Sequence, residues 1–183
     1  MTIWEITNDW TNKVSMLVVT ENDRSSLHFW DQFGGDGSPI RWTKPPKLQP
    51  FVDKKRSKQK PRADISPFMP GSLELNAKAY AALGDFLGQF GQLLEVDVLG
   101  EAEYYYNVTH VIDGIDRDKS EVLPGGFVKK PAFRESSIPA QATVFKDARH
   151  RSSIYVNDAA KSELEKRVAE SGITGMSFRK AGE

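Results

Sequence analysis

Short apolar stretches recur along the chain, and their alternation or β-branching is typical of β-strands. The first is 14–20, and a shorter one at 27–30 precedes a glycine-rich turn at 34–39. Further strands are predicted at 93–98, 103–112, 127–128, 142–145, 153–156 and 173–178. In the longest of these, a period of two places Tyr104, Tyr106, Val108, His110 and Ile112 on one face and Glu103, Tyr105, Asn107, Thr109 and Val111 on the other.

Two other stretches have helical spacing. Over 77–90 the apolar stripe consists of Tyr80, Leu83, Leu87 and Phe90. Over 159–171 the inward positions are Ala160, Leu164 and Val168. The predicted caps and ends are Asn76 and Gly91 for the first helix, and Asn157 or Asp158 and Gly172 for the second.

Together these elements predict an α+β fold, in which a mainly antiparallel sheet is packed by two principal helices. The 183 residues suit a single domain. Residues 1–40 are expected to add strands to the sheet or to form a small N-terminal β lobe. Residues 41–183 are expected to form the main domain, within which 44–72 is a basic, proline-rich strap and 54–62 is a solvated loop or mobile part of it.

The composition excludes several classes of protein. The chain has no cysteine, so it contains no disulfide, thiolate zinc site, iron–sulfur cluster or thiol nucleophile. Its apolar runs are far shorter than the roughly 20 residues of a membrane span. The first residues show no secretory signal. We therefore expect a cytoplasmic protein without contact to a membrane.

The formal net charge is zero, but the charge is strongly segregated along the chain. By segment it is −3 over 1–43, +6 over 44–72, −7 over 73–121 and +4 over 122–183. This balance argues against a uniformly basic nucleic-acid binder. The segment 73–121 has the largest net charge, so it is a candidate binding surface.

The sequence contains only weak candidates for a catalytic, metal-binding or cofactor-binding site. The three histidines, His28, His110 and His150, belong to no metal-spacing motif, and 34–37 lacks the Lys-Ser/Thr of a phosphate loop. The carboxylates of 113–118 lack the rest of a calcium-loop pattern and are expected to lie in a solvated turn. We therefore predict no catalytic residue, metal or cofactor.

The acidic segment is the better candidate for a binding surface, because acidic residues there surround three consecutive tyrosines. Such a surface can attract a basic protein, and tyrosines are favoured at interfaces. The predicted partner-binding residues are Glu101, Glu103, Tyr105, Asp113, Asp116 and Asp118. An ordinary sheet with solvated carboxylates fits the same local pattern.

Two other functions remain open from the residues. The basic stretch 44–62 could bind nucleic acid through phosphate, although Phe51 is its only aromatic residue. An enzyme could instead use a histidine and a carboxylate, such as His110 and Asp113.

The order of several motifs adds a resemblance. A Lys/Pro-rich stretch ends at 60–64 and is followed by Phe-Met-Pro-Gly-Ser at 68–72 and a helix. A strand then carries Tyr-Tyr-Asn-Val at 105–108, and Gly-Ile-Thr-Gly-Met-Ser-Phe at 172–178 closes the chain. Over roughly 40–180 this series resembles the immunity proteins of bacterial polymorphic toxin systems, in the group catalogued as immunity family eleven.

The resemblance implies a cytoplasmic antitoxin that binds a cognate toxin delivered by contact-dependent or type VI secretion. In some relatives the toxin is a nuclease of the His-Asn-His type. The resemblance does not identify any catalytic residue in this chain. The expected function is therefore stoichiometric inhibition of a toxin. An acidic surface could cover the basic groove a nuclease presents to phosphate, or binding at a neighbouring site could prevent closure of the toxin. An enzyme that reverses the toxin's damage is the alternative.

Overall fold

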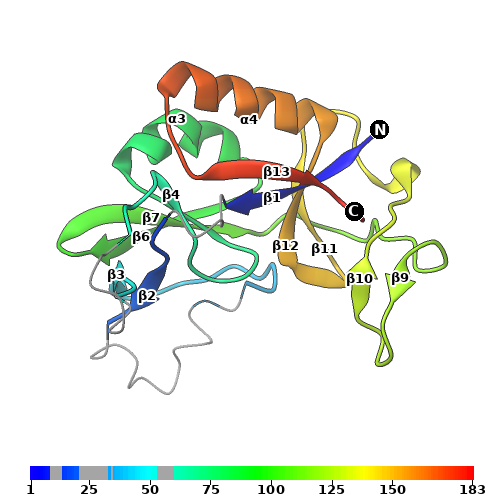
Figure 1. Ribbon diagram of the computed structural model, residues 1–183, viewed down its shortest axis with the longest axis horizontal. Coiled ribbons are helices and arrows are strands. Elements are labelled where there is room, and N and C mark those ends of the chain that lie inside the picture. Colours follow the sequence, from blue (N-terminus) through cyan, green and yellow to red (C-terminus); the bar gives the residue numbers. More distant parts are fainter. Residues whose placement is uncertain (9–13, 21–32, 34, 53–59) are drawn as a thin grey trace.

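A computed structural model describes residues 1–8, 14–20, 33, 35–52 and 60–183. In these ranges the chain forms two larger sheets, a two-stranded ribbon and two α-helices (Figure 1). The predicted strand at 27–30 lies outside the described residues, as does the lysine-rich part of the strap at 53–59. The predicted α+β fold with mainly antiparallel pairing is confirmed, but the strands form two larger sheets instead of the single sheet expected.

The first sheet has five strands in the order β13-β1-β12-β11-β8. Their bounds are Met176–Lys180, Ile3–Asn8, His150–Asn157, Val144–Asp147 and Val111–Ile112, in that order. All neighbours are antiparallel except β8 and β11. The N-terminal strand β1 lies inside this sheet, so it is not part of a separate lobe.

The second sheet has six strands in the order β2-β3-β6-β7-β5-β4. Their bounds are Leu17–Val19, Lys47–Pro50, Gly91–Val98, Glu101–Val108, Leu73–Leu75 and Ile65–Ser66, in that order. Only β3 and β6 are parallel. The basic strap thus contributes β3 and β4, and its part after the predicted solvated loop enters the core, where Ala63, Ile65 and Phe68 are buried.

Both predicted helices are present on the same side of the sheets (Figure 1). In α3 (Ala77–Leu87) the Asn76 side chain accepts from the Ala79 N–H at 2.9 Å, and in α4 (Asp158–Ser171) Asn157 accepts from Ala160 at 2.9 Å. Gly172 ends α4 with φ +61°, as predicted.

The prediction that Gly91 ends α3 is wrong. The helix ends at Leu87, and Gly91 begins β6 instead. A Cβ at Gly91 would overlap the Asn107 carbonyl on the neighbouring β7, so glycine is needed for close strand packing. Tyr80, assigned to the inward stripe, is 37% exposed and stacks on Tyr104 with 3.6 Å between ring centroids.

The main core lies between the helices and the two sheets. It joins residues of α3 and α4 to the inner faces of the central strands: Ile6, Leu75, Leu83, Leu87, Tyr106, Val108, Ile154, Val156, Ala160 and Leu164. Smaller clusters form on the opposite faces of the two sheets, around Tyr105 in the six-stranded sheet and Tyr155 in the five-stranded one. The alternation predicted for the long strand is thus confirmed from Tyr104 to Val108.

The predicted strand 103–112 is in fact two strands in different sheets. Beyond Val108 the N–H groups of Thr109 and His110 both donate to the Phe90 carbonyl, at 3.1 and 3.0 Å. The chain then enters the five-stranded sheet as β8, so this crossing connects the two sheets. The prediction failed here because the sequence pattern does not show which neighbour a strand pairs with.

After β8 the chain forms the ribbon of β9 (Glu121–Val122) and β10 (Val128–Lys130), followed by a 3-10 turn, η1 (Glu135–Ser137). In Figure 1 this ribbon projects from the body of the molecule at one end of its long axis.

Candidate functional site

The six residues predicted to bind a partner do not form one surface. Figure 1 places the turn between β6 and β7, next to Glu101, at one end of the molecule's long axis. The segment between β8 and β9, which carries Asp113, Asp116 and Asp118, lies toward the opposite end. The expectation of a single acidic surface is therefore wrong, because the fold divides its members between two ends.

Tyr105 is not available to a partner. Its side chain is fully buried and packs edge-on against Phe33 and Phe68, with ring centroids 5.3 and 6.0 Å away. Burial raises the pKa of the Tyr105 hydroxyl to about 12. The predicted role as an interface residue is wrong, because the strand turns this side chain into the core behind the six-stranded sheet.

Glu103 is also withdrawn from the surface, into an ion-pair network. Arg62 donates to Glu103 Oε1 at 2.8 Å and Oε2 at 2.5 Å, and its Nη2 also lies 3.3 Å from Glu74 Oε2. Glu103 is 6% exposed and Glu74 is fully buried. The predicted contact through Glu103 is therefore replaced by a structural one, which attaches the end of the strap to the sheet.

The two carboxyl groups of this network titrate in opposite directions. Burial raises the pKa of Glu74 far above its ordinary value, and the adjacent Glu103 carboxylate adds to the effect. Burial opposes ionisation of Glu103 too, but the hydrogen bonds from Arg62 outweigh it and hold the pKa of Glu103 below its ordinary value. At neutral pH the network therefore consists of a cation, one carboxylate and one protonated carboxyl.

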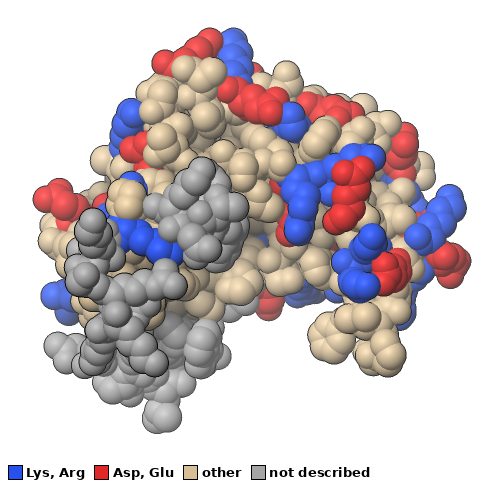
Figure 2. All heavy atoms as spheres, in the orientation of Figure 1, with Lys and Arg blue, Asp and Glu red and all other residues tan. Residues whose placement is uncertain are grey.

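Part of the acidic charge of 73–121 is neutralised by basic residues from elsewhere in the chain. Four of its ten acidic side chains form ion pairs with lysine or arginine outside this segment, namely Asp85, Glu103, Asp113 and Glu121, and Asp116 pairs with Lys119 within it. Figure 2 shows acidic and basic side chains interspersed on the face in view. Charges that are separated along the sequence are therefore mixed on the face of the molecule in view.

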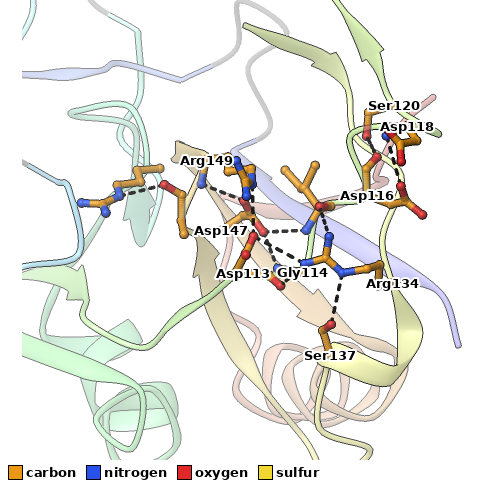
Figure 3. Close-up of polar contacts among 12 residues, drawn as sticks. Asp113, Gly114, Asp116, Asp118, Ser120, Arg134, Ser137, Asp147 and Arg149 are labelled. Atoms are coloured by element: carbon orange, nitrogen blue, oxygen red, sulfur yellow. Dashed lines mark hydrogen bonds and ion pairs between the residues drawn. The ribbon is translucent and has the colours of Figure 1, made fainter. Parts of the chain in front are cut away.

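Asp113 belongs to such a network. Its Oδ1 accepts from Arg149 Nε at 3.1 Å and lies 3.5 Å from Arg134 Nη2. The hydrogen bond from Arg149 holds the pKa of Asp113 below its ordinary value, and the nearby Arg134 charge reinforces this. Figure 3 shows both guanidinium groups directed at Asp113. Two cations beside one carboxylate leave this site without net negative charge.

Beneath Asp113 lies a carboxylate that the sequence did not single out. Asp147 is fully buried, and it accepts the N–H groups of Gly114 and Ile115 at 2.8 Å each and that of Arg149 at 2.8 Å (Figure 3). These bonds fix the conformation of the two backbone segments that carry Asp113 and Arg149. An aspartate at the end of a predicted strand gives no sign of such a role.

Asp116 and Asp118 lie in a turn, as expected for solvated carboxylates. Asp116 Oδ1 accepts the Asp118 N–H at 3.1 Å, and its carbonyl accepts from the Ser120 hydroxyl at 2.6 Å (Figure 3). Lys119 Nζ is 3.7 Å from Asp116 Oδ2. Asp118 is exposed, and it is the more accessible of the two carboxylates of this turn.

The ribbon that follows this turn has an apolar tip. Phe127 is 74% exposed and Leu123 is 46% exposed, on either side of a Pro-Gly-Gly turn. Leu123 N–H donates to the Phe127 carbonyl at 2.8 Å, so the two residues face each other across the ribbon. Figure 2 shows uncharged side chains at this projecting tip. Apolar residues flanking Pro-Gly-Gly indicate a hairpin, but the pattern does not reveal exposure.

The stem of the ribbon is charged, since Lys129 pairs with Glu121 at 2.6 Å. The end of the molecule thus combines an exposed aromatic tip, a charged stem and the accessible Asp118. Such a combination suits protein recognition, because exposed aromatic residues are frequent hot spots and charges around them steer the approach.

The alternative nucleic-acid site in 44–62 is described only in part. Arg62 is committed to Glu74 and Glu103. Lys44 and Lys47 are exposed, and Phe51 is 50% exposed. The cations at 54–58 lie outside the described residues, so most of this basic cluster is not placed.

The alternative catalytic pair, His110 with Asp113, is not assembled. His110 Nδ1 lies 3.0 Å from the Val144 carbonyl and its ring stacks on Phe90, whereas Asp113 binds two arginines. His150 Nδ1 is 2.6 Å from the Tyr155 hydroxyl. Each described histidine thus has a structural partner, and His28 lies outside the described residues.

A buried lysine next to a polar groove is a further feature that the sequence did not reveal. Lys146 is fully buried and donates to the Gly35 carbonyl. Burial lowers the pKa of its amine to about 8. The adjacent groove, of about 450 Å³, lies between β1, β12 and residues 69–73. Because Lys146 does not line this groove, we assign it the structural role of attaching the 35–38 segment to β11.

Within the described ranges no group of three or more His, Asp or Glu residues is arranged to hold a metal ion. None of the helices described is both long and apolar enough to cross a membrane. No protein-family model matches the chain, and no curated protein matches it.

Proposed function

We propose that this chain is an immunity protein that acts in the cytoplasm, where it binds a cognate secreted bacterial toxin and neutralises it by stoichiometric protein–protein contact. A nuclease is the class of toxin that the sequence resemblance favours. The proposal requires no catalytic residue, metal or cofactor of this chain.

The motifs behind the resemblance have identifiable roles in folding. Tyr106 and Val108 belong to the main core, Gly172 ends α4, and Thr174 donates through its N–H and hydroxyl to Asp64 at 2.9 and 3.0 Å. These motifs therefore shape the fold of this chain. They carry no information about the surface that contacts a toxin.

The observation that carries the proposal is the exposed apolar tip of the β9–β10 ribbon. Burial of a side chain such as Phe127 in a partner removes most of its surface from water, and a projecting ribbon can reach into a concave active site. We assign the toxin contact to this end of the molecule, with Leu123 and Phe127 at its centre and Asp118 at its edge.

The test uses the C-terminal domain of the protein encoded immediately upstream as the toxin. Co-expression of this chain should restore growth of cells that produce that domain, and calorimetry should give a stoichiometry of one to one. Phe127→Asp should weaken binding by about 30-fold or more and abolish protection, because a hot-spot aromatic is replaced by a charge.

Leu99→Asp is the matched control, because Leu99 is 70% exposed but lies in the β6–β7 turn at the other end of the molecule. It should leave affinity and protection unchanged. Protection at far less than one equivalent would instead indicate an enzyme. Strong, salt-dependent binding of DNA or RNA by the chain alone would favour the nucleic-acid alternative.

A further inference from the structure

The tip of the β9–β10 ribbon is a tight turn with a defined geometry. Gly126 N–H donates to the Leu123 carbonyl at 3.0 Å, so residues 123–126 form a hydrogen-bonded β-turn. Proline at the second position of this turn and Gly125, with φ +97°, at the third are the residues that favour a type II turn. The apolar side chains of Leu123 and Phe127 are therefore held on either side of a preformed turn.

The base of the ribbon consists of two antiparallel segments, which are residues 113–116 and 131–134. Arg134 N–H donates to the Gly114 carbonyl at 2.8 Å, and Asp116 N–H donates to the Ala132 carbonyl at 2.8 Å. The Ser120 hydroxyl joins the same segments, because it donates to the Asp116 carbonyl at 2.6 Å and accepts the Ala132 N–H at 2.9 Å. These bonds continue the antiparallel pairing of the ribbon toward the five-stranded sheet.

The Arg134 side chain fixes this base through bonds to main-chain atoms. Its guanidinium donates to the carbonyls of Ile115 at 2.7 Å and Asp113 at 2.6 Å (Figure 3). The N–H groups of Gly114 and Ile115 are bound by the buried Asp147 carboxylate. Donors and acceptors of the same short segment are thus both held, which fixes the direction in which the chain leaves the sheet.

Arg149 contacts the same aspartate but does not hold the base. Its Nε donates to Asp113 Oδ1 at 3.1 Å, and none of the hydrogen bonds from its side chain to described residues reaches a main-chain carbonyl of the base. The side chains of Arg134 and Arg149 are similarly exposed, at 38% and 43%. The two arginines therefore share their charge, their exposure and their ionic partner, and differ in the bonds to the backbone.

The base is also attached to the core by apolar contacts. Ile115 faces Phe133 in the antiparallel pair and is fully buried. The Phe133 ring packs edge-on against Tyr155 of β12, with 5.0 Å between ring centroids. Because these contacts do not involve the guanidinium of Arg134, a substitution of Arg134 should leave the rest of the fold intact.

The ordered ribbon indicates the kind of surface that it fits. A segment that is ordered before binding loses little conformational entropy when it binds, so it suits a partner with a cleft of matching shape. The tip, 123–127, carries no charged residue, whereas the stem carries the pair of Glu121 and Lys129. An apolar tip with a charged stem complements a cleft with an apolar floor and a polar rim.

We propose that Arg134 is a positioning residue that fixes the direction of the β9–β10 ribbon, so that the ribbon enters an apolar cleft of the toxin as a preformed wedge. This inference rests on the proposed function, because it deepens the contact assigned there to Leu123 and Phe127. Arg134 acts through the ribbon and not by contact with the toxin.

The first measurement uses the chain alone and needs no toxin. By NMR relaxation, the Leu123 and Val128 amides of the parent chain should be as ordered as the Val156 amide of β12. In Arg134→Lys the order of the two ribbon amides should fall, and hydrogen exchange at Leu123 should become about tenfold faster. Exchange at Val156 should stay unchanged, whereas a general loss of stability would accelerate it as well.

The second measurement is the affinity for the toxin domain. Lysine keeps the positive charge of Arg134, so long-range attraction to the toxin is preserved, and Arg134→Lys should weaken binding by about tenfold through the loosened ribbon. Arg149→Lys is the matched control and should leave both ribbon order and affinity unchanged. Ser120→Ala removes the hydroxyl that joins the base, and it should loosen the ribbon in the same way should Arg134→Lys fold poorly.

The proposal is overturned if the ribbon amides are already mobile in the parent chain, or if they stay ordered in Arg134→Lys. It is also overturned if Arg134→Lys loosens the ribbon without loss of affinity while Phe127→Asp prevents binding, and the proposed function then stands. Unchanged binding by Phe127→Asp would instead show that the toxin contact itself is wrongly assigned, and the wedge would fall with it.

Discussion

Glu74 shows how the environment of one residue can reverse its ordinary chemistry. A glutamate is expected to be exposed and ionised, but this one is fully buried between Arg62 and Glu103. Its Oε1 has no hydrogen-bond partner among the described residues, and neither does Arg62 Nε. A protonated Glu74 is the form that this site stabilises, since two adjacent buried carboxylates cannot both be balanced by one arginine.

The stability of the protein should therefore depend on pH through Glu74. Because its pKa is raised on folding, the folded state holds a proton that the unfolded state loses above its ordinary value of 4.5. The free energy of unfolding should fall as pH rises beyond that value. Glu74→Gln, which keeps the neutral shape, should match the parent at pH 5 and be more stable by about 1–3 kcal/mol at pH 8 in urea denaturation.

The matched variant is Glu103→Gln, which removes the ionised partner of Arg62. It should destabilise the protein by about 2 kcal/mol at pH 7, because a partly buried cation is left without its carboxylate. Equal effects of the two substitutions at pH 7 would contradict the assignment of the proton to Glu74.

At the scale of elements, the connection into β13 requires a glycine because the chain there passes close to a strand that is distant in the sequence. Gly175 has φ +100°, and a Cβ there would overlap the Ile65 carbonyl of β4. This close approach places Thr174 against β4, where its carbonyl accepts the Ile65 N–H at 3.0 Å. Gly175 thus lets the chain pass from its contact with β4 in the six-stranded sheet directly into β13 of the five-stranded sheet.

Alanine at Gly175 should cost more stability than the same change at Gly100. Gly100 has a similar φ of +93° but open space around it, so Gly100→Ala should cost about 1 kcal/mol for backbone strain alone. Gly175→Ala should cost at least about 2 kcal/mol more, because the backbone of β4 must move. Equal midpoints in urea denaturation would show that the contact with Ile65 is unimportant.

At the scale of the whole molecule, ion pairs between distant segments distribute the charge. The acidic segment is balanced in part by arginines of 134–167 and by Arg62, which the linear sequence places far away. The two ends of the long axis retain separate exposed carboxylates, Glu101 and Asp118. A partner that covers one end leaves the other untouched.

Charge reversal at the two ends should therefore have unequal effects on toxin binding. Under the proposed function, Asp118→Lys should slow association by roughly threefold to tenfold at low salt, because it reverses a charge beside the contact. Glu101→Lys, at the opposite end, should leave the association rate unchanged. Surface plasmon resonance at two salt concentrations measures both, and a larger effect of Glu101→Lys would move the contact to the β6–β7 end.

The sequence by itself determined the features that depend on neighbouring residues. The helices, their caps at Asn76 and Asn157, the αL end at Gly172 and the alternation of Tyr104 to Val108 were predictable, because each follows from local backbone geometry. The α+β class follows from the same local patterns.

Only the tertiary structure decided which of these residues can meet a partner. Burial removed Tyr105 and Glu103, ion pairs neutralised Asp113, and the split of 103–112 into two sheets separated Glu101 from Asp118. Strand pairing also exposed Phe127. These outcomes depend on contacts between residues far apart in the chain. Such contacts cannot be predicted from the periodicity or the charge pattern of the sequence.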